Sequence, residues 1–229
     1  IRYPYQTCLV INCIFDGNIA GDDTGGIQFV GGKNIKIHNS TLKHNVGNVG
    51  GGISIKRVVL LVVQNCDISE NNATQSGGGI HVSEVKNKSI LYRCTLLDNK
   101  VKLNGGAMNI IRGVFFLISN CRVQQNKAKS AGGINSDECK NLIFSASSLL
   151  FNHATFQGGG FFFLGGSVIF IFNVHLTGNI AGKKGASLIA ENKESLYLSA
   201  VSIHYKEGEF ITSSIIVVTQ TSYTSRIQF

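Results

Sequence analysis

Apolar and polar residues alternate in short runs along this chain, and the same order of runs returns every 26 to 28 residues. A glycine-rich corner precedes a first alternating run, a second run follows, and a brief third run ends near an asparagine. This closing asparagine recurs without exception in seven repeats, at Asn18, Asn45, Asn71, Asn99, Asn126, Asn152 and Asn179. Alternation of period two predicts β-strands, and a period of this length predicts a solenoid with one coil per repeat.

A further corner is visible within each repeat. The inward positions on either side of a second asparagine, such as Asn39 or Asn120, are not two residues apart, which places a corner there. Asparagine tolerates the left-handed backbone of such a turn, although Arg93 and Ala146 replace it in two coils. Successive parallel strands require right-handed crossovers. We therefore predict an all-β fold, a right-handed parallel β-helix of about eight coils of 26–28 residues.

One domain is expected over residues 1–229, with regular coils over 13–190 and degenerate coils over 191–229. The stretch from Ser213 to Val217 reads as another first strand, because Ile215 falls 27 residues after Leu188. The chain begins in mid-pattern at Ile1, without an initiator methionine. We expect a segment of a longer protein or a processed product.

The closing asparagines are expected to form a structural ladder, since stacked amides can pair buried turn groups from coil to coil. Four of the six cysteines share one phase, five residues before the closing asparagine: Cys13, Cys66, Cys94 and Cys121. Serine or valine takes this position in other coils, so we predict a small buried stacking position. Stacked neighbours lie ~4.8 Å apart, and the sequence leaves open a bridge from Cys94 to Cys66 or Cys121.

Two kinds of corner motif carry a family resemblance. Gly105-Gly106-Ala107-Met108 and Phe15-Asp16-Gly17-Asn18 are closest to paired GGA[ILV] and FxxN motifs, which relax elsewhere to GGI, GGGI or GGGF and to [LIV]xxN. The chain thereby resembles the repeats of chlamydial polymorphic outer membrane proteins over residues 13 to about 190. The resemblance implies a β-helix of the pectin-lyase-like type and a role in surface adhesion.

Catalysis is not indicated. The outward positions of the first strand carry no carboxylate: Gln28, Ser54, His81, Asn109, Asn135, Phe162 and Ile189. Polysaccharide lyases and hydrolases need clustered carboxylates, and the six histidines share no coil phase. We expect no catalytic, cofactor or metal site. No apolar run reaches the length of a membrane span.

The outer face of the second strand is unusually apolar. Leu9, Lys36, Val62, Ile90, Leu117, Ile143, Phe170 and Tyr197 occupy one phase, with Phe172 beside them. A solvated sheet face should show polar residues, so we predict that another protein chain or a flanking segment covers this stripe.

Basic residues and sequons complete the candidate sites. With a formal charge of +8, the chain should favour acidic partners. Lysines 33, 86, 140 and 193 are predicted to share one loop stack, and lysines 100 and 102 to lie above lysines 127 and 129. These suit acidic glycans more than nucleic acid, because no aromatic residues interleave with them. Asn39 carries a sequon but is expected to be inaccessible, which leaves Asn72 and Asn87, in loops, as glycosylation candidates.

These features together predict an extracellular or cell-surface structural or adhesive β-helix, part of a surface protein or filament. It would act through protein–protein or protein–glycan contacts. The alternative is a carbohydrate-active β-helix of the lyase or hydrolase kind.

Overall fold

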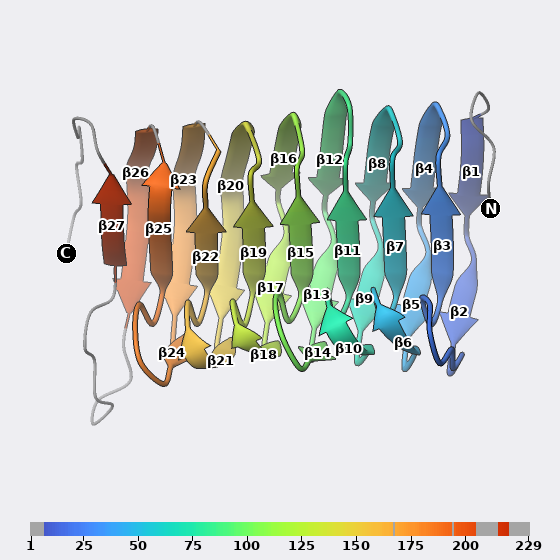
Figure 1. The fold of residues 1–229 in the computed structure, drawn as a ribbon, viewed down its shortest axis with the longest axis horizontal. Helices are drawn as coiled ribbons and strands as arrows, with labels where there is room; N and C mark the ends of the chain where they lie inside the picture. The colour runs from blue at the N-terminus through green and yellow to red at the C-terminus, as the bar shows by residue number, and fades with distance from the viewer. Residues whose placement is uncertain (1–6, 167, 194, 205–214, 220–229) are drawn as a thin grey trace.

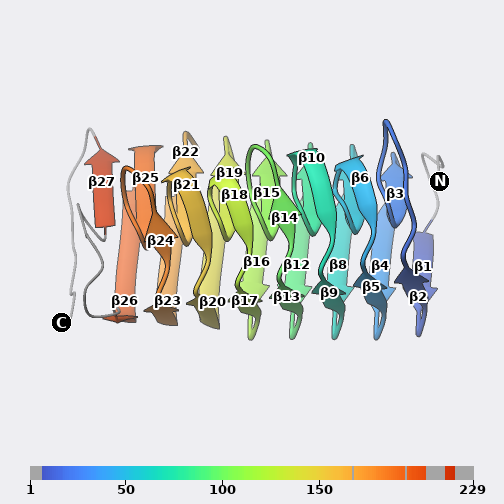
Figure 2. The same ribbon diagram turned by 90° about the horizontal axis from the view of Figure 1, so that it is seen from below.

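The computed structural model describes residues 7–166, 168–193, 195–204 and 215–219, and their regular secondary structure is entirely β-strand. The strands wind into coils that stack along one axis, with the N-terminal coil at one end and the C-terminal coil at the other (Figure 1). Every strand pairing in the three sheets is parallel, as the sequence period predicts (Figures 1 and 2).

The first strands form an eight-stranded sheet with one strand from each successive coil. They are β3 (Ile27–Val30), β7 (Ile53–Lys56), β11 (Ile80–Ser83), β15 (Met108–Ile111), β19 (Ile134–Asp137), β22 (Phe161–Leu164), β25 (Leu188–Lys193) and β27 (Ile215–Thr219). Ile215 lies opposite Leu188, so the predicted eighth first strand is confirmed. The rest of the predicted degenerate region, 205–214 and 220–229, lies outside the described residues.

The second and third strands share a 13-stranded sheet. In the early coils they are separate: β1 (Thr7–Ile11), β2 (Ile14–Asp16), β4 (Asn34–His38), β5 (Thr41–Lys43), β8 (Leu60–Gln64), β9 (Asp67–Ser69), β12 (Lys88–Tyr92), β13 (Thr95–Leu97), β16 (Phe115–Ser119) and β17 (Arg122–Gln124). In the later coils they fuse into β20 (Asn141–Leu150), β23 (Val168–Thr177) and β26 (Ser195–His204).

A third sheet of six short strands closes each coil and faces the viewer in Figure 2. Its strands are β6 (Val46–Val49), β10 (Asn72–Ser76), β14 (Lys100–Val101), β18 (Lys127–Ser130), β21 (His153–Gln157) and β24 (Ile180–Ala181). Each follows a closing asparagine directly.

The core fills the space between the three sheets. Alternate residues of each strand point inward, as Ile35 and Ile37 do, and both are fully buried. Five phenylalanines are the largest of these buried side chains, and Phe161 packs edge-on against Phe144 at 4.8 Å between ring centroids. Side chains at equivalent positions of successive coils stack on one another and form one continuous hydrophobic core along the helix.

The second corner adopts left-handed backbone in every described coil, with φ between 46° and 54° at Asn12, Asn39, Asn65, Arg93, Asn120, Ala146, Asn173 and Ala200. The prediction of a left-handed corner is thereby confirmed. The expectation that Asn39 is inaccessible is wrong, since its side chain is exposed. The corner points outward, and Asn39 Oδ1 accepts a surface hydrogen bond from Asn65 Nδ2 at 3.1 Å.

The glycine pairs allow neighbouring coils to approach closely. A Cβ atom added at Gly106 would lie 2.1 Å from the carbonyl oxygen of Gly132, far inside van der Waals contact. Glycine is required there because of this approach between backbones.

Candidate functional site

The closing asparagines form one hydrogen-bonded column through the molecule. The Oδ1 of Asn126 accepts two hydrogen bonds from Asn99, one from its backbone N–H at 2.9 Å and one from its side-chain Nδ2 at 3.0 Å. The Nδ2 of Asn126 donates to the carbonyl oxygen of Leu96 at 2.9 Å. The same arrangement recurs from Asn45 to Asn179, all buried. Asn18, in the first coil, is exposed. The column pairs buried turn groups and offers no reactive atom to solvent.

The cysteines that share one position in the repeat also form a column, and their thiols make hydrogen bonds to the backbone. Each Sγ donates to the carbonyl two residues earlier, at 3.2 Å for Cys66 and 3.3 Å for both Cys94 and Cys121. In other coils the hydroxyls of Ser40 and Ser147 make this same bond. The hydroxyl and the thiol therefore play one structural part at this corner, which the packing interpretation did not include.

All six cysteines of the chain are free thiols. Hydrogen bonding to Cys121 and to Cys66, together with burial, raises the pKa of the Cys94 thiol well above its ordinary value. A thiol that stays protonated is a poor nucleophile and a poor metal ligand. The described part of the chain also holds no group of three or more His, Cys, Asp or Glu placed to bind a metal ion.

The outward positions of the first sheet are covered from Ser54 to Ile189, although they point away from the core. Ser54, His81 and Asn109 are at most 5% exposed. The segment just before each glycine pair folds over them, so that Ser76 Oγ lies 3.0 Å from His81 Nδ1. Asn109 Nδ2 approaches the same ring nitrogen at 3.2 Å, and Asn135 Nδ2 donates to Asn109 Oδ1 at 2.7 Å. A polar ladder therefore lies where lyases of this architecture would need an open face.

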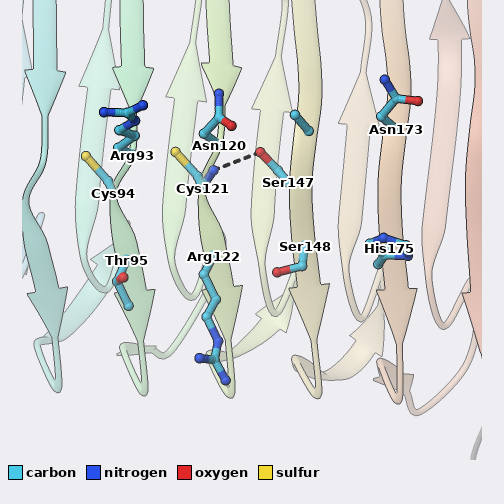
Figure 3. A pocket seen from close by; sticks show the side chains of 11 residues that line it. Arg93, Cys94, Thr95, Asn120, Cys121, Arg122, Ser147, Ser148, Asn173 and His175 are labelled. Carbon is cyan, nitrogen blue, oxygen red and sulfur yellow. Dashed lines mark hydrogen bonds between the residues drawn. The ribbon is translucent and has the colours of Figure 1, made fainter.

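A hollow with a volume of about 540 Å³ lies outside the second corner. Figure 3 shows its residues in rows across successive coils. The corner row contains Arg93, Asn120, Ala146 and Asn173, and the row beyond it contains Thr95, Arg122, Ser148 and His175. Cys94, Cys121 and Ser147 are buried beneath. The sequence analysis did not predict this hollow. The only indication in the sequence was Arg93, which replaces the asparagine of the second corner.

The chemistry of this hollow suits binding more than reaction. Two guanidinium groups and one imidazole line it, and no carboxylate does. His175 Nδ1 makes a hydrogen bond to Ser202 Oγ in the next coil, and no carboxylate among the residues that line the hollow orients that imidazole. A hydrolytic triad requires that third group. The two guanidinium groups can therefore hold an anionic or polar group in this hollow.

The apolar stripe is a single row in register. Leu9, Lys36, Val62, Ile90, Leu117, Ile143, Phe170 and Tyr197 lie opposite one another through the 13-stranded sheet. Phe170 and Tyr197 stack at 4.8 Å and remain 39% and 41% exposed. Phe172, in the adjacent row, is 40% exposed, and Val62, Ile90, Leu117 and Ile143 are half-buried.

The predicted loop stack of lysines is confirmed only in part: Lys33, Lys86 and Lys140 all lie between the first and second strands of their coils, but no two of these coils are adjacent. Lys33 and Lys140 precede equivalent strands, but the positions between them hold Val59, Asn87 and Val114. Lys86 lies one residue out of register because its loop, between β11 and β12, is one residue longer than its neighbours. The side chain of Lys193 lies outside the described residues.

The second set of lysines does come together. Lys100 lies opposite Lys127, and these two line a shared hollow of about 270 Å³ with Lys102 and Lys129. Of the sequons, Asn87 lies in an exposed loop as predicted. The placement of Asn72 in a loop is wrong, since it is the first residue of β10, although its side chain is exposed.

With this geometry in view, the family can be assigned. The model of the family described as "right handed beta helix region" matches residues 3–224. The chain belongs to this family. The parallel sheets, the corners and the coil-to-coil columns described above are those of a right-handed β-helix.

Two relatives of this β-helix are much longer proteins. Metabotropic glutamate receptor-like protein R of Dictyostelium discoideum is 24% identical over 203 residues, covering 89% of this chain and 12% of its own length. Probable outer membrane protein PmpB of Chlamydia trachomatis is 31% identical over 96 residues, covering 42% of this chain and 6% of its own. The chain thus spans a small fraction of either protein. No solved structure matches it.

Proposed function

We propose that this chain is a structural or adhesive β-helix of an extracellular or cell-surface protein, without catalytic activity of its own. It acts through contacts of its outer faces with other protein chains and with glycans. The observation that carries this proposal is the apolar row on the 13-stranded sheet, in which seven of eight outward residues are apolar. An aligned apolar surface on a soluble body marks a contact surface for another protein.

A surface location is supported by the partial similarity to a protein named as a probable outer membrane protein. The receptor-like name of the longer match points the same way. The described residues include no helix long and apolar enough to cross a bilayer.

The proposal is tested against the carbohydrate-active alternative by incubating the purified chain with oligogalacturonate and with heparin oligosaccharides. New reducing ends report hydrolysis, and ultraviolet absorbance of unsaturated uronates reports elimination. We expect neither, because the outward positions of the first sheet are buried and carry no carboxylate pair. Release of shortened products would overturn the proposal in favour of a lyase or hydrolase.

A further inference from the structure

Four lysine side chains gather on the third sheet of two adjacent coils. Lys100 and Lys102 lie on one coil, and Lys127 and Lys129 lie on the next. All four side chains are exposed. Val101 and Ala128, between them, point inward and are 6% exposed. Alternation sends the side chains of Lys100, Lys127 and Lys129 to the outside of the third sheet. Lys102, which follows β14 directly, borders the same hollow of about 270 Å³. We call this set the lysine cluster.

The lysine cluster lacks compensating negative charge. None of the residues that line its hollow is acidic, and none of the ion pairs found in the described ranges involves these lysines. The nearest carboxylate in sequence, that of Asp98, makes no such pair either. Like charges on opposed positions of neighbouring strands are destabilising. The four neighbouring positive charges therefore do not stabilise the fold.

The surroundings of the lysine cluster are polar and open. His153 lies opposite Lys127 in the following coil, and Asn72 lies opposite Lys100 in the preceding coil. Thr155 completes the rim. The same two coils carry Arg93 and Arg122 on the hollow beyond the second corner. Positive charge thus extends around these two coils, flanked by hydroxyl and amide groups.

These features favour a ligand with several anionic groups and many hydroxyls. Nucleic acid would need aromatic platforms for its bases, and no aromatic residue lines the hollow. A membrane surface would need an apolar face to insert beside the charges, whereas the rim here is polar.

We propose that the lysine cluster is a binding site for an acidic polysaccharide, whose sulfate or carboxylate groups pair with the four ammonium groups. The inference rests on the proposed adhesive function and names the class of glycan that the module holds. Sugar hydroxyls meet Thr155 and His153 at the edges of the hollow.

The test measures binding of a fluorescent heparin oligosaccharide to the chain at about 0.15 M salt. A cluster variant replaces Lys100, Lys102, Lys127 and Lys129 by Gln. A control variant replaces four other exposed lysines by Gln: Lys33, Lys86, Lys88 and Lys140. Each variant removes four charges from the formal net charge of +8, so the comparison separates the site from overall electrostatic attraction.

We expect the cluster variant to bind roughly 30-fold more weakly and the control variant to stay within about threefold of the parent. Both should melt no lower than the parent, because every cluster side chain is exposed. Equal weakening of both variants, or parental affinity in the cluster variant, would overturn the inference.

Competing ligands and product analysis complete the test. Single-stranded DNA and phosphatidylserine vesicles are expected to bind the cluster more weakly than heparin does. Equal or tighter binding of either would overturn the assignment to a glycan. Cleavage of heparin by the parent would instead overturn the proposed function, while the loss of binding in the cluster variant would still locate the site.

Discussion

At the scale of single residues, the closing asparagine makes the most hydrogen bonds per side chain. In each interior coil its Oδ1 accepts two donors from the preceding coil, and its Nδ2 serves two acceptors on neighbouring coils. Its partners are backbone groups and the side-chain amides of the neighbouring asparagines. An unpaired buried group costs about 1–3 kcal/mol.

We therefore predict that Asn126→Ala lowers the free energy of unfolding by about 1–3 kcal/mol. Asn18→Ala is the matched control: Asn18 occupies the same corner but is exposed, so its loss should cost less than half as much. Denaturant unfolding of both variants measures the difference. Transitions of Asn126→Ala that overlay the parent would contradict a stabilising role for the ladder.

The buried histidine of the first sheet makes stability depend on pH. Burial, with a smaller contribution from Lys56, lowers the pKa of His81 to about 4, whereas an unfolded histidine titrates near about 6.5. Between these values the unfolded chain binds the extra proton. The contribution of a neutral His81 is thus fully present above about pH 6.5 and is lost as pH falls toward about 4.

We predict that the parent loses about 3 kcal/mol more stability than His81→Asn between pH 7 and pH 4. Asparagine is a suitable replacement because Asn109 and Asn135 occupy the same column in the next coils. Unfolding free energies measured across this pH range report the effect. Parallel curves for parent and variant would show that His81 is not buried in its neutral form.

At the scale of the strand and its corners, most of the fold could be predicted from the sequence, because equivalent positions of successive coils hold similar residues. The left-handed corner at Asn39 and Asn120, the ladder phase and the inward positions all follow from period and alternation. Parallel pairing of identical residues also fixed the register, since a slip by one would turn the inward residues outward.

Features that depend on loop length or on covering segments were not predictable in this way. One extra residue between β11 and β12 moves Lys86 out of register with Lys33, and spacing counted within one coil cannot show that. His81 looked exposed because alternation marks it as outward, but Ser76 and Gly77 cover it. The positive φ of Gly77 allows that segment to fold back.

The outer face of the second strands yields a prediction for assembly. Leu117→Lys with Phe170→Lys places two charges in the apolar row and should abolish assembly while leaving the coil folded, because both side chains point away from the core. Thr74→Lys with Thr155→Lys adds the same charge on the third sheet, where both side chains are exposed. This control should assemble like the parent. Light scattering and circular dichroism distinguish the outcomes; normal assembly of the first variant would exclude this face as the interface.

At the scale of the whole molecule, each coil contacts only its neighbours, so whole coils are the units of stability. Asn99 and Asn126 are 27 residues apart and directly bonded. Deletion of residues 100–126 joins Asn99 to Lys127, whose register already matches Lys100.

We predict that this one-coil deletion folds cooperatively with a lower melting temperature than the parent. Deletion of residues 100–112 alone removes part of a coil, breaks every column below it, and should give an unfolded or aggregated chain. Circular dichroism with thermal melts compares the two. A one-coil deletion that cannot fold would contradict the independence of the coils.

The amide ladder gives the helix a direction that its sheets alone do not. At each step the earlier asparagine offers N–H groups and the later one offers the oxygen, from Asn18 through Asn179. Every amide–amide step therefore has its donors in the earlier coil and its acceptor in the later coil, so the described column has a polarity along the helix axis that parallel strand pairing alone does not set.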